Sequence, residues 1–355
     1  MPPTEKELLG LAVERLNDVL PPGWSVRTVN TVSDRLFDAV VEVGSGVGPD
    51  AVLVADVKTL FRPRDVEYTV RQLQQSAATI DDAAAAMPLL VARYLSPSAR
   101  ERIAAMGACY IDATGNIRVV SSDPALAVLV SGQDSDPWRG PGRPRATLTG
   151  APAARVVRAL VDIEPPYSVP ELIEASGAST GATYRVVKFL DAETLLERDD
   201  DGRIVTVAWQ RLLRRWATDY GVTRADAVRR YLEPRGIDAT LARLREIDDD
   251  QYVITGSVAA QLDAAYAPPR LLAVYLRDAR VAEDVLQLRP VEQGTNVLVA
   301  VNDDSFAFER ARTAEGLRYA AVSQVVVDLL DLPGRSPSEA EALLDWMGAD
   351  DAWRD

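Results

Sequence analysis

A stretch rich in glycine, proline and arginine, SGQDSDPWRGPGRPRAT at residues 131–147, limits how this chain can fold. Glycine and proline at this density interrupt helices and strands, so the stretch predicts a linker between separately folded parts. The chain has 355 residues, which is too long for one ordinary hydrophobic core. Together with the residue patterns described below, the linker predicts three folded parts, at residues 1–130, 148–220 and 221–355.

The composition excludes several classes of chemistry. The chain has no histidine and one cysteine, Cys109, which excludes Ser-His-Asp and Cys-His catalysis and metal sites built on those side chains. Metal chemistry is left to carboxylates, which favour Mg²⁺ or Mn²⁺. The net charge of −14 makes the whole chain a poor general DNA binder, so any DNA contact needs a local basic patch.

No apolar run reaches the ~18 residues that a bilayer span needs. The first residues, MPPTEKELLG, carry acids and lack the apolar stretch of a signal peptide. We therefore expect a cytoplasmic protein with no membrane partner.

Residues 1–130 alternate helical and strand patterns, which predicts an α/β domain. The apolar spacing predicts helices within 4–20, 64–84 and 96–108, strands within 35–43, 50–59 and 87–95, and a strand pair within 109–120.

The two strands at 35–43 and 50–59 carry the first candidate site. Asp38 lies in one strand and Asp56 in the next, so a strand–turn–strand unit brings both carboxylates to one end of a sheet. Period-two alternation places Lys58 on the same face as Asp56. Two carboxylates can bind a divalent cation, and a lysine can orient the attacking water beside a phosphate.

The segment FDAVVEV…AVLVADVKT, followed by a helix containing RQLQ at 71–74, resembles the PD-(D/E)XK nuclease core. The resemblance implies metal binding by Asp38 and Asp56, catalysis by Lys58, and a supporting role for Gln72. It also implies an acid on the first helix. We favour Glu14, although the sequence does not distinguish it from Glu5 or Glu7.

Residues 148–220 predict three short helices, within 151–163, 168–177 and 179–195, followed by a hairpin within 195–209. This order is typical of a winged helix-turn-helix. Ser179 or Thr180 would cap the third helix. The residues that we expect to contact double-stranded DNA lie at the start of that helix and are Ser179, Thr180, Thr183, Tyr184, Arg185 and Lys188.

The linker adds Arg139, Arg143 and Arg145 to this DNA-binding set. The GRP sequence with flanking arginine resembles an AT-hook, an arm that enters the A·T minor groove. Residues 137–190 carry seven basic and four acidic side chains, a net +3 within an acidic chain. The hairpin tip opposes this trend, because Asp199, Asp200 and Asp201 would repel phosphate there.

The segment YVITGSVAAQLDAAYAPPRLLAVYLRD resembles the start of a nucleotidyltransferase-like domain. Gly256 and Ser257 form the expected turn, but the following strand has no carboxylate pair and only Asp278 comes after it. A two-metal mechanism needs both acids. We therefore expect a degenerate nucleotidyltransferase-like domain with a structural or partner-binding role.

The chain as a whole resembles the antitoxin-like AbiEi proteins of type IV toxin–antitoxin systems. The resemblance rests on LLVARYLSPSARERIAAMGACYIDATGNIRV, on the helices after it and on YVITGSVAA. It implies a DNA-binding transcriptional regulator. We expect a homodimer that needs no cofactor for DNA binding and whose flanking α/β domains are catalytically silent. The alternative is a Mg²⁺- or Mn²⁺-dependent endonuclease targeted to DNA by the winged helix. We interpret Asp112 and Asn116 as turn-forming residues.

Overall fold

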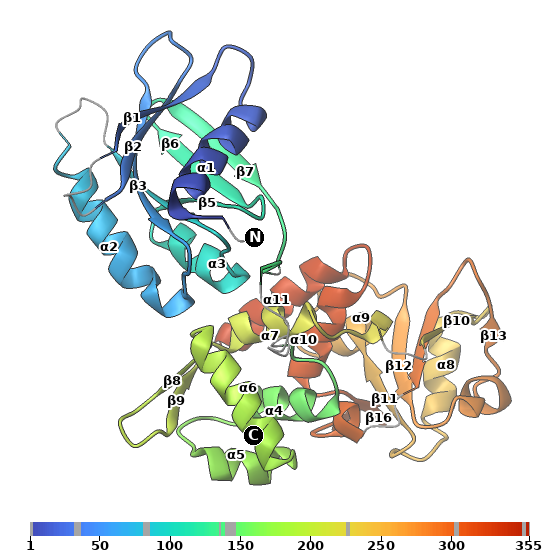
Figure 1. Ribbon diagram of the computed structural model, residues 1–355. Coiled ribbons are helices and arrows are strands. Elements are labelled where there is room, and N and C mark those ends of the chain that lie inside the picture. The colour runs from blue at the N-terminus through green and yellow to red at the C-terminus, as the bar shows by residue number, and fades with distance from the viewer. Residues whose placement is uncertain are drawn as a thin grey trace. The chain divides into compact units, whose positions relative to one another are not determined.

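The computed structural model describes residues 3–31, 37–80, 86–134, 136–138, 147–224, 228–301, 305–349 and 353–354. The chain forms two compact units, one of residues 1–144 with 192–194 and one of residues 145–191 with 195–355. Each unit contains a seven-stranded sheet with helices packed against it, so the mixed α/β class predicted from the sequence is confirmed (Figure 1).

The sheet of the first unit keeps its strands in chain order. The first three strands are antiparallel, the third to fifth are parallel, and the last three are antiparallel again. Their bounds are β1 Ser25–Thr31, β2 Ala39–Gly44, β3 Ala51–Lys58, β4 Met87–Ala92, β5 Cys109–Asp112, β6 Ile117–Ser122 and β7 Ala125–Val130. The sequence patterns predicted neither β1 nor β7.

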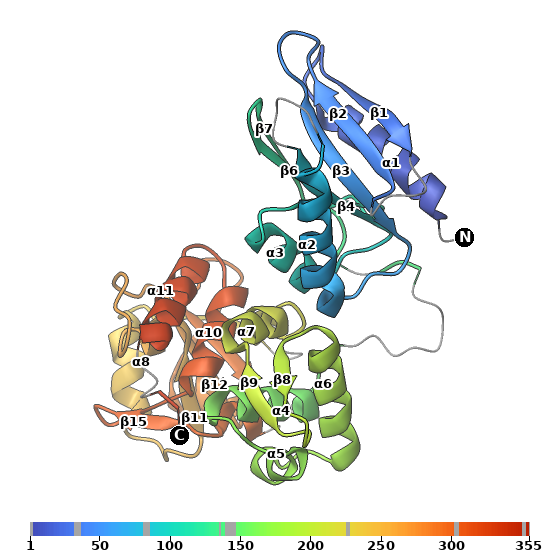
Figure 2. The same cartoon turned by 90° about the vertical axis from the view of Figure 1, so that its left-hand side faces the viewer.

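Three helices cover this sheet: α1 (Glu5–Val19), α2 (Val66–Ala77) and α3 (Pro97–Ala105). Leu53, Ala55 and Val57 of β3 pack in the same core cluster as α1. Val54 points to the opposite face, where it packs against α2. Figure 2 shows α2 and α3 on one side of the sheet and α1 on the other. Because Asp56 and Lys58 alternate with Val57 and share the parity of Val54, they lie on the α2 face.

The second unit begins with a module of three helices and a hairpin, followed by another helix. Their bounds are α4 Ala151–Asp162, α5 Val169–Ser176, α6 Thr180–Ala192, β8 Leu196–Arg198, β9 Ile204–Val207 and α7 Trp209–Ala217. Gly177, with φ +60°, ends α5 in the left-handed region that glycine favours. The order of these elements agrees with the sequence prediction, and we call residues 147–208 the helix–hairpin module.

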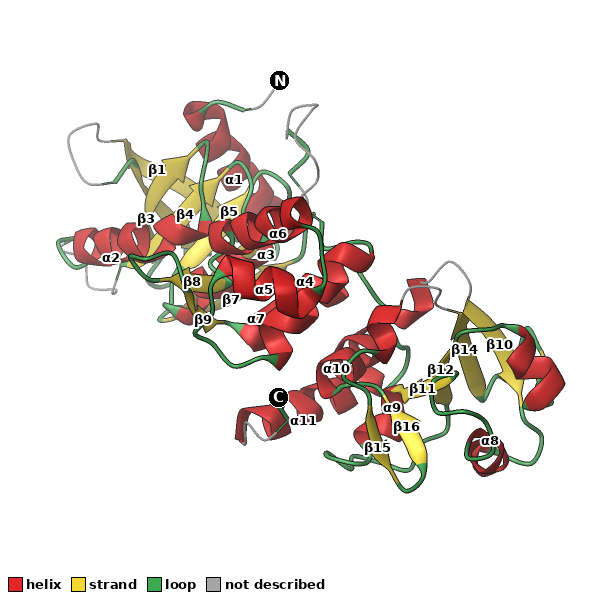
Figure 3. Cartoon of the chain, turned by 90° about the horizontal axis from the view of Figure 1, so that it is seen from below, coloured by secondary structure: helices red, strands yellow, loops and turns green. Residues whose placement is uncertain are grey.

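The second sheet has the strand order β13-β10-β14-β12-β11-β16-β15. Its strands are β10 Val228–Leu232, β11 Tyr252–Thr255, β12 Leu272–Leu276, β13 Arg289–Pro290, β14 Val297–Val301, β15 Arg312–Ala314 and β16 Leu317–Tyr319. The accompanying helices are α8 Ile237–Leu244, α9 Gly256–Ala260, α10 Val322–Asp331 and α11 Ser336–Ala349. Figure 3 shows α10 and α11 beside this sheet.

The helix–hairpin module and the second sheet share one hydrophobic core, because α4 and α7 pack against α10. Arg158 of α4 is fully buried in this core. Its guanidinium pairs with Asp162 at 3.0 Å and donates to the carbonyls of Phe306 and Glu309 at 3.0 and 2.7 Å. These bonds tie the module to the loop between β14 and β15.

Candidate functional site

The pairing of β2 with β3 brings Asp38, Asp56 and Lys58 together, as the sequence predicts. Asp38 directly precedes β2, and its amide donates to the Ala55 carbonyl of β3 at 2.8 Å. Asp38 Oδ2 accepts a 2.7 Å hydrogen bond from the Val57 amide, which holds the carboxylate beside β3. Lys58 Nζ forms a 2.8 Å ion pair with Asp56 Oδ1.

The electrostatics of this site are dominated by burial of Asp56. Its residue is 7% exposed, and burial raises the pKa of its carboxyl to about 6. Lys58 opposes this rise in pKa, whereas the neighbouring Asp38 carboxylate adds to it. Asp38 is exposed and the Lys58 side chain is 41% exposed, so the site opens to solvent.

Two carboxylates against one ammonium leave an excess of negative charge, and this donor set fits a divalent cation. Within the described residues, no three His, Cys, Asp or Glu side chains are arranged so that together they could hold a metal ion. A Mg²⁺ or Mn²⁺ ion would therefore take two ligands from Asp38 and Asp56 and the others from backbone carbonyls and water.

The helix residues suggested for this site divide between the two faces of the sheet. Gln72 is half-buried on α2, the helix that covers the Asp56 face. Glu14 is exposed on α1, which packs against the opposite face. Glu7 accepts from the Thr4 amide at 2.7 Å in the capping box of α1. The structure therefore adds no acid from α1 to the Asp56 face.

The second candidate site is the outer face of α6. Ser179 caps this helix, since its side chain accepts from the Ala182 amide at 3.4 Å. The exposed residues that follow are Thr180, Tyr184, Arg185 and Lys188, and Tyr184 is 51% exposed. Tyr184, Arg185 and Lys188 make no hydrogen bond or ion pair with any other described residue. This face is therefore available to a ligand.

Thr183 does not belong to this face, although the sequence analysis placed it there. Its side chain is fully buried, and its hydroxyl donates to the Ser179 carbonyl at 3.2 Å. Val186, Val187 and Leu190 are buried on the same side of α6, as predicted. Thr183 therefore lies on the buried apolar side of α6, and it is not available to contact DNA.

The positive charge predicted for this region is reduced by internal pairing. Arg158 is buried against Asp162, and Arg155 pairs with Glu309 at 3.2 Å. Arg139, Arg143 and Arg145 lie outside the described residues. Two of the seven predicted basic residues, Arg185 and Lys188, remain exposed and unpaired within the described part.

The hairpin tip between β8 and β9 presents acidic side chains. Asp199, Asp200 and Asp201 are all exposed. Asp199 Oδ1 accepts from the Arg203 amide at 2.8 Å, so this aspartate also shapes the turn. The exposed triplet gives the tip a negative charge that disfavours contact with phosphate.

Side chains from the C-terminal part of the chain, Glu339 and Leu332, occupy the space beside the Gly256–Ser257 turn. The Ser257 hydroxyl donates to Glu339 of α11 at 2.5 Å, and Arg335 pairs with the same carboxylate at 2.7 Å. A Cβ on Gly256 would lie 3.0 Å from a Leu332 methyl group, so the turn is closely covered. Asp278, the acid after β12, is paired with Arg280 at 2.6 Å.

Behind this turn lies a buried carboxylate that the sequence analysis missed. Asp328 of α10 is fully buried and accepts from Thr255 Oγ1, Tyr275 OH and Gln324 Nε2 at 2.6, 2.8 and 3.0 Å. Burial raises the pKa of Asp328 to about 7. An aspartate within the apolar helix sequence VSQVVVDLLD is the signal that points to such a residue.

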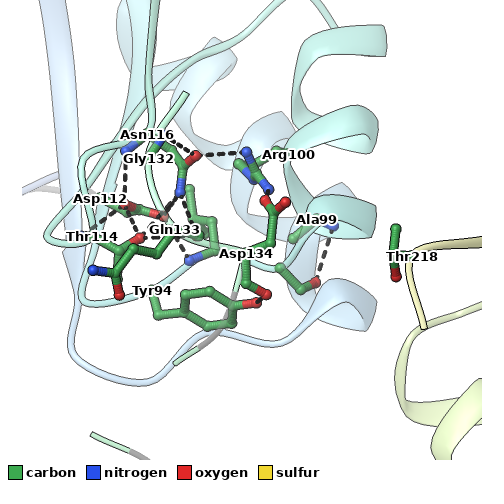
Figure 4. Close-up of polar contacts among 12 residues, drawn as sticks. Tyr94, Ala99, Arg100, Asp112, Thr114, Asn116, Gly132, Gln133, Asp134 and Thr218 are labelled. Atoms are coloured by element: carbon green, nitrogen blue, oxygen red, sulfur yellow. Dashed lines mark hydrogen bonds and ion pairs between the residues drawn. The ribbon is translucent and has the colours of Figure 1, made fainter. Parts of the chain in front are cut away.

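Asp112 and Asn116 form a closed network at the end of β5 (Figure 4). The Asp112 carboxylate accepts hydrogen bonds of 2.6–3.1 Å from Thr114, Asn116 and the Leu95 amide. Asn116 Oδ1 accepts from Arg100 at 2.6 Å. Both Asp112 oxygens are engaged inside the chain, which agrees with the turn-forming role inferred from the sequence.

The chain was compared with protein-family models, curated proteins and solved structures. No family model, no curated protein and no solved structure matches this chain. In the part of the chain that the structure describes, no helix is long and apolar enough to cross a membrane.

Proposed function

We propose that this protein binds double-stranded DNA through α6 and acts as a transcriptional regulator. The observation that carries the proposal is the outer face of α6, where Tyr184, Arg185 and Lys188 are exposed without partners in the described part. In this proposal, residues 147–208 are a winged helix-turn-helix and α6 is its recognition helix.

The geometry of the module supports this role. A recognition helix contacts base edges and phosphates with its first turns, and Ser179, Thr180, Tyr184 and Arg185 occupy the first turns of α6. Arg139, Arg143 and Arg145 would add a minor-groove arm. The resemblance to AbiEi proteins supports the same function, and the acidic hairpin tip would face away from DNA.

A footprint of the full chain on the DNA upstream of its own gene tests the proposal. Arg185→Ala is expected to weaken binding to the preferred site by about 1–3 kcal/mol if Arg185 contacts a base edge. Arg280→Ala is the matched control, because Arg280 is an exposed arginine of the same unit and pairs only with Asp278 among the described residues. Equal binding by wild type and Arg185→Ala would contradict the proposal.

A second candidate function, metal-dependent DNA cleavage, rests on the convergence of Asp38, Asp56 and Lys58. A divalent cation would polarise the phosphate and its attacking water. Asp38 and Asp56 would bind that cation, and Lys58 would leave its ion pair to orient the water. Adding Mg²⁺ to the footprint separates the two functions: protection without cutting favours the regulator. Strand breaks that Asp56→Asn abolishes would make the nuclease primary.

A further inference from the structure

The two seven-stranded sheets in the described part of the chain have four edge strands, and three of them are protected against pairing with another strand. An unprotected edge offers free backbone N–H and C=O groups to a further strand, and proteins block such edges with charges, proline, bulges or short strands. β13 has two residues, one of them Pro290, and β15 has three residues that include Arg312, which pairs with Asp263.

β1 is longer, but it is protected in other ways. Its pairing with β2 is interrupted by an irregularity between Thr28 and Asn30. Arg27 on this strand forms ion pairs with Glu42 at 3.1 Å and with Asp50 at 2.7 Å. A second chain that docked here would have to displace these charged side chains.

β7 has none of these features. Its six residues, ALAVLV, are all apolar, and it pairs with β6 along its whole length without a bulge. Val128 is buried in the core that contains α1, whereas Leu129 on the other face is 69% exposed. Ala125 and Ala127 are exposed on the same face as Leu129. The edge strand is therefore apolar on both faces, although no element of the described structure covers the face that carries Ala125, Ala127 and Leu129.

The neighbouring strand extends this exposed apolar surface. Val120 of β6 is 37% exposed and lies opposite Ala127 in the antiparallel register. Arg118 lies opposite Leu129, and Ser122 lies opposite Ala125. The resulting face is a strip with Arg118 at one end, Ser122 at the other end and apolar side chains between them.

This strip is complementary to itself under a two-fold rotation. An antiparallel pair of β7 strands centred on Ala127 places Leu129 of each copy opposite Ala125 of the other. Each Leu129 then faces an alanine across the junction, the two Ala127 side chains face each other, and Arg118 of one copy falls in the row of Ser122 rather than in the row of the other Arg118. No like charges meet, which matters for a chain of net charge −14.

We propose that β7 is the dimer interface of this protein, where two copies pair their edge strands antiparallel and join their first sheets into one continuous sheet. The occupant is a second copy, because the strip has the two-fold complementarity that an identical strand requires. A nucleic acid would need positive charge, which ALAVLV does not supply.

Sedimentation of the full chain at micromolar concentration tests this interface. Wild type is expected to be a dimer, and Leu129→Arg should raise the dissociation constant at least about tenfold, because it places a guanidinium against the partner's apolar strip. Val29→Arg is the matched control, since Val29 is 55% exposed on β1, the opposite edge of the same sheet. A monomeric wild type, or a dimer that Leu129→Arg leaves intact, overturns the proposal.

Cross-linking gives an independent readout of the same geometry. The native Cys109 is buried, so Ala127→Cys introduces the accessible thiol. A short bifunctional thiol reagent should join two Ala127→Cys chains covalently and leave Val29→Cys chains separate. Covalent dimers from Val29→Cys, or from neither variant, would place the interface elsewhere, for example on the helix–hairpin module.

Discussion

Asp56 and Asp328 are both buried aspartates, and burial raises the pKa of each carboxyl, to about 6 and to about 7. Their surroundings differ. Asp328 is surrounded by three uncharged donors, whereas Asp56 has a charged lysine on one side and a second carboxylate on the other. The three hydrogen-bond donors of Asp328 all come from within the fold, whereas Asp56 and Asp38 leave an excess of negative charge that a divalent cation could offset. The comparison distinguishes a structural carboxylate from a candidate ligand.

The largest expected effect is the loss of Asp328. Asp328→Ala leaves the buried donors of Thr255, Tyr275 and Gln324 without their acceptor, which should destabilise the second unit by about 3–5 kcal/mol. Asp328→Asn keeps an acceptor oxygen and should destabilise it less. Urea unfolding followed by intrinsic tryptophan fluorescence, to which the buried Trp216 of the second unit contributes, measures both variants. A loss of less than about 1 kcal/mol in the free energy of unfolding of Asp328→Ala would show that Asp328 is not a structural carboxylate in contrast to Asp56.

The next effect is on the pH dependence of stability. The pKa of Asp328 rises from 3.8 to about 7 on folding, so the folded unit keeps a proton that the unfolded chain has released. This stabilisation is complete below about pH 4 and is lost as the pH rises through about 7, with a fall of about 2 kcal/mol between pH 5 and 7. Asp328→Asn should abolish this slope in the second unit and leave the contribution of Asp56 to the first unit, and denaturation at several pH values tests it.

Divalent cations should act on the first unit and not on the second. Mn²⁺ or Mg²⁺ at ten times its dissociation constant would stabilise the first unit by about 1.4 kcal/mol, a small rise in melting temperature. Asp56→Asn should eliminate this rise, whereas Asp328→Asn should retain it. Differential scanning calorimetry with and without metal distinguishes the two variants, and a rise that persists in Asp56→Asn would rule out this site.

The smallest effects are shifts in the pKa of Asp56 itself. Lys58 lowers that pKa and Asp38 raises it, so Lys58→Ala should move it above about 6 and Asp38→Asn should move it below. NMR titration of the Asp56 carboxyl carbon measures both directions. If both substitutions shifted the pKa of Asp56 in the same direction, Lys58 and Asp38 would not have the opposite effects on this carboxyl that the structure indicates.

Local patterns in the sequence predicted part of this structure well. The gathering of Asp38, Asp56 and Lys58 followed from strand alternation and a short turn, which are properties of neighbouring residues. The alternation rule failed for β1 and β7. β1 is a polar edge strand with an irregular register, and β7 is apolar on both faces, so neither shows the pattern of a half-buried strand.

The residues that the sequence placed wrongly or missed depend on distant partners. Arg158 was counted as positive charge near DNA, but it is buried against carbonyls about 150 residues further along the chain. Thr183 has the polarity of a surface residue and the helical position of a core residue. Asp328 meets Gln324 one turn earlier on α10, but its other two donors, Thr255 and Tyr275, lie on strands that only the fold brings together. The long-range contacts of Arg158 with Phe306 and Glu309, and those of Asp328 with Thr255 and Tyr275, are not visible in local spacing.

The buried Arg158 also limits how the helix–hairpin module can be used as a separate part. Cutting the chain at residue 220 would expose the face of α4 and α7 that packs on α10 and would leave the Arg158 guanidinium without its carbonyl acceptors. The helix–hairpin module therefore depends on the second sheet for part of its buried core. A fusion protein that contains the module must also contain that sheet.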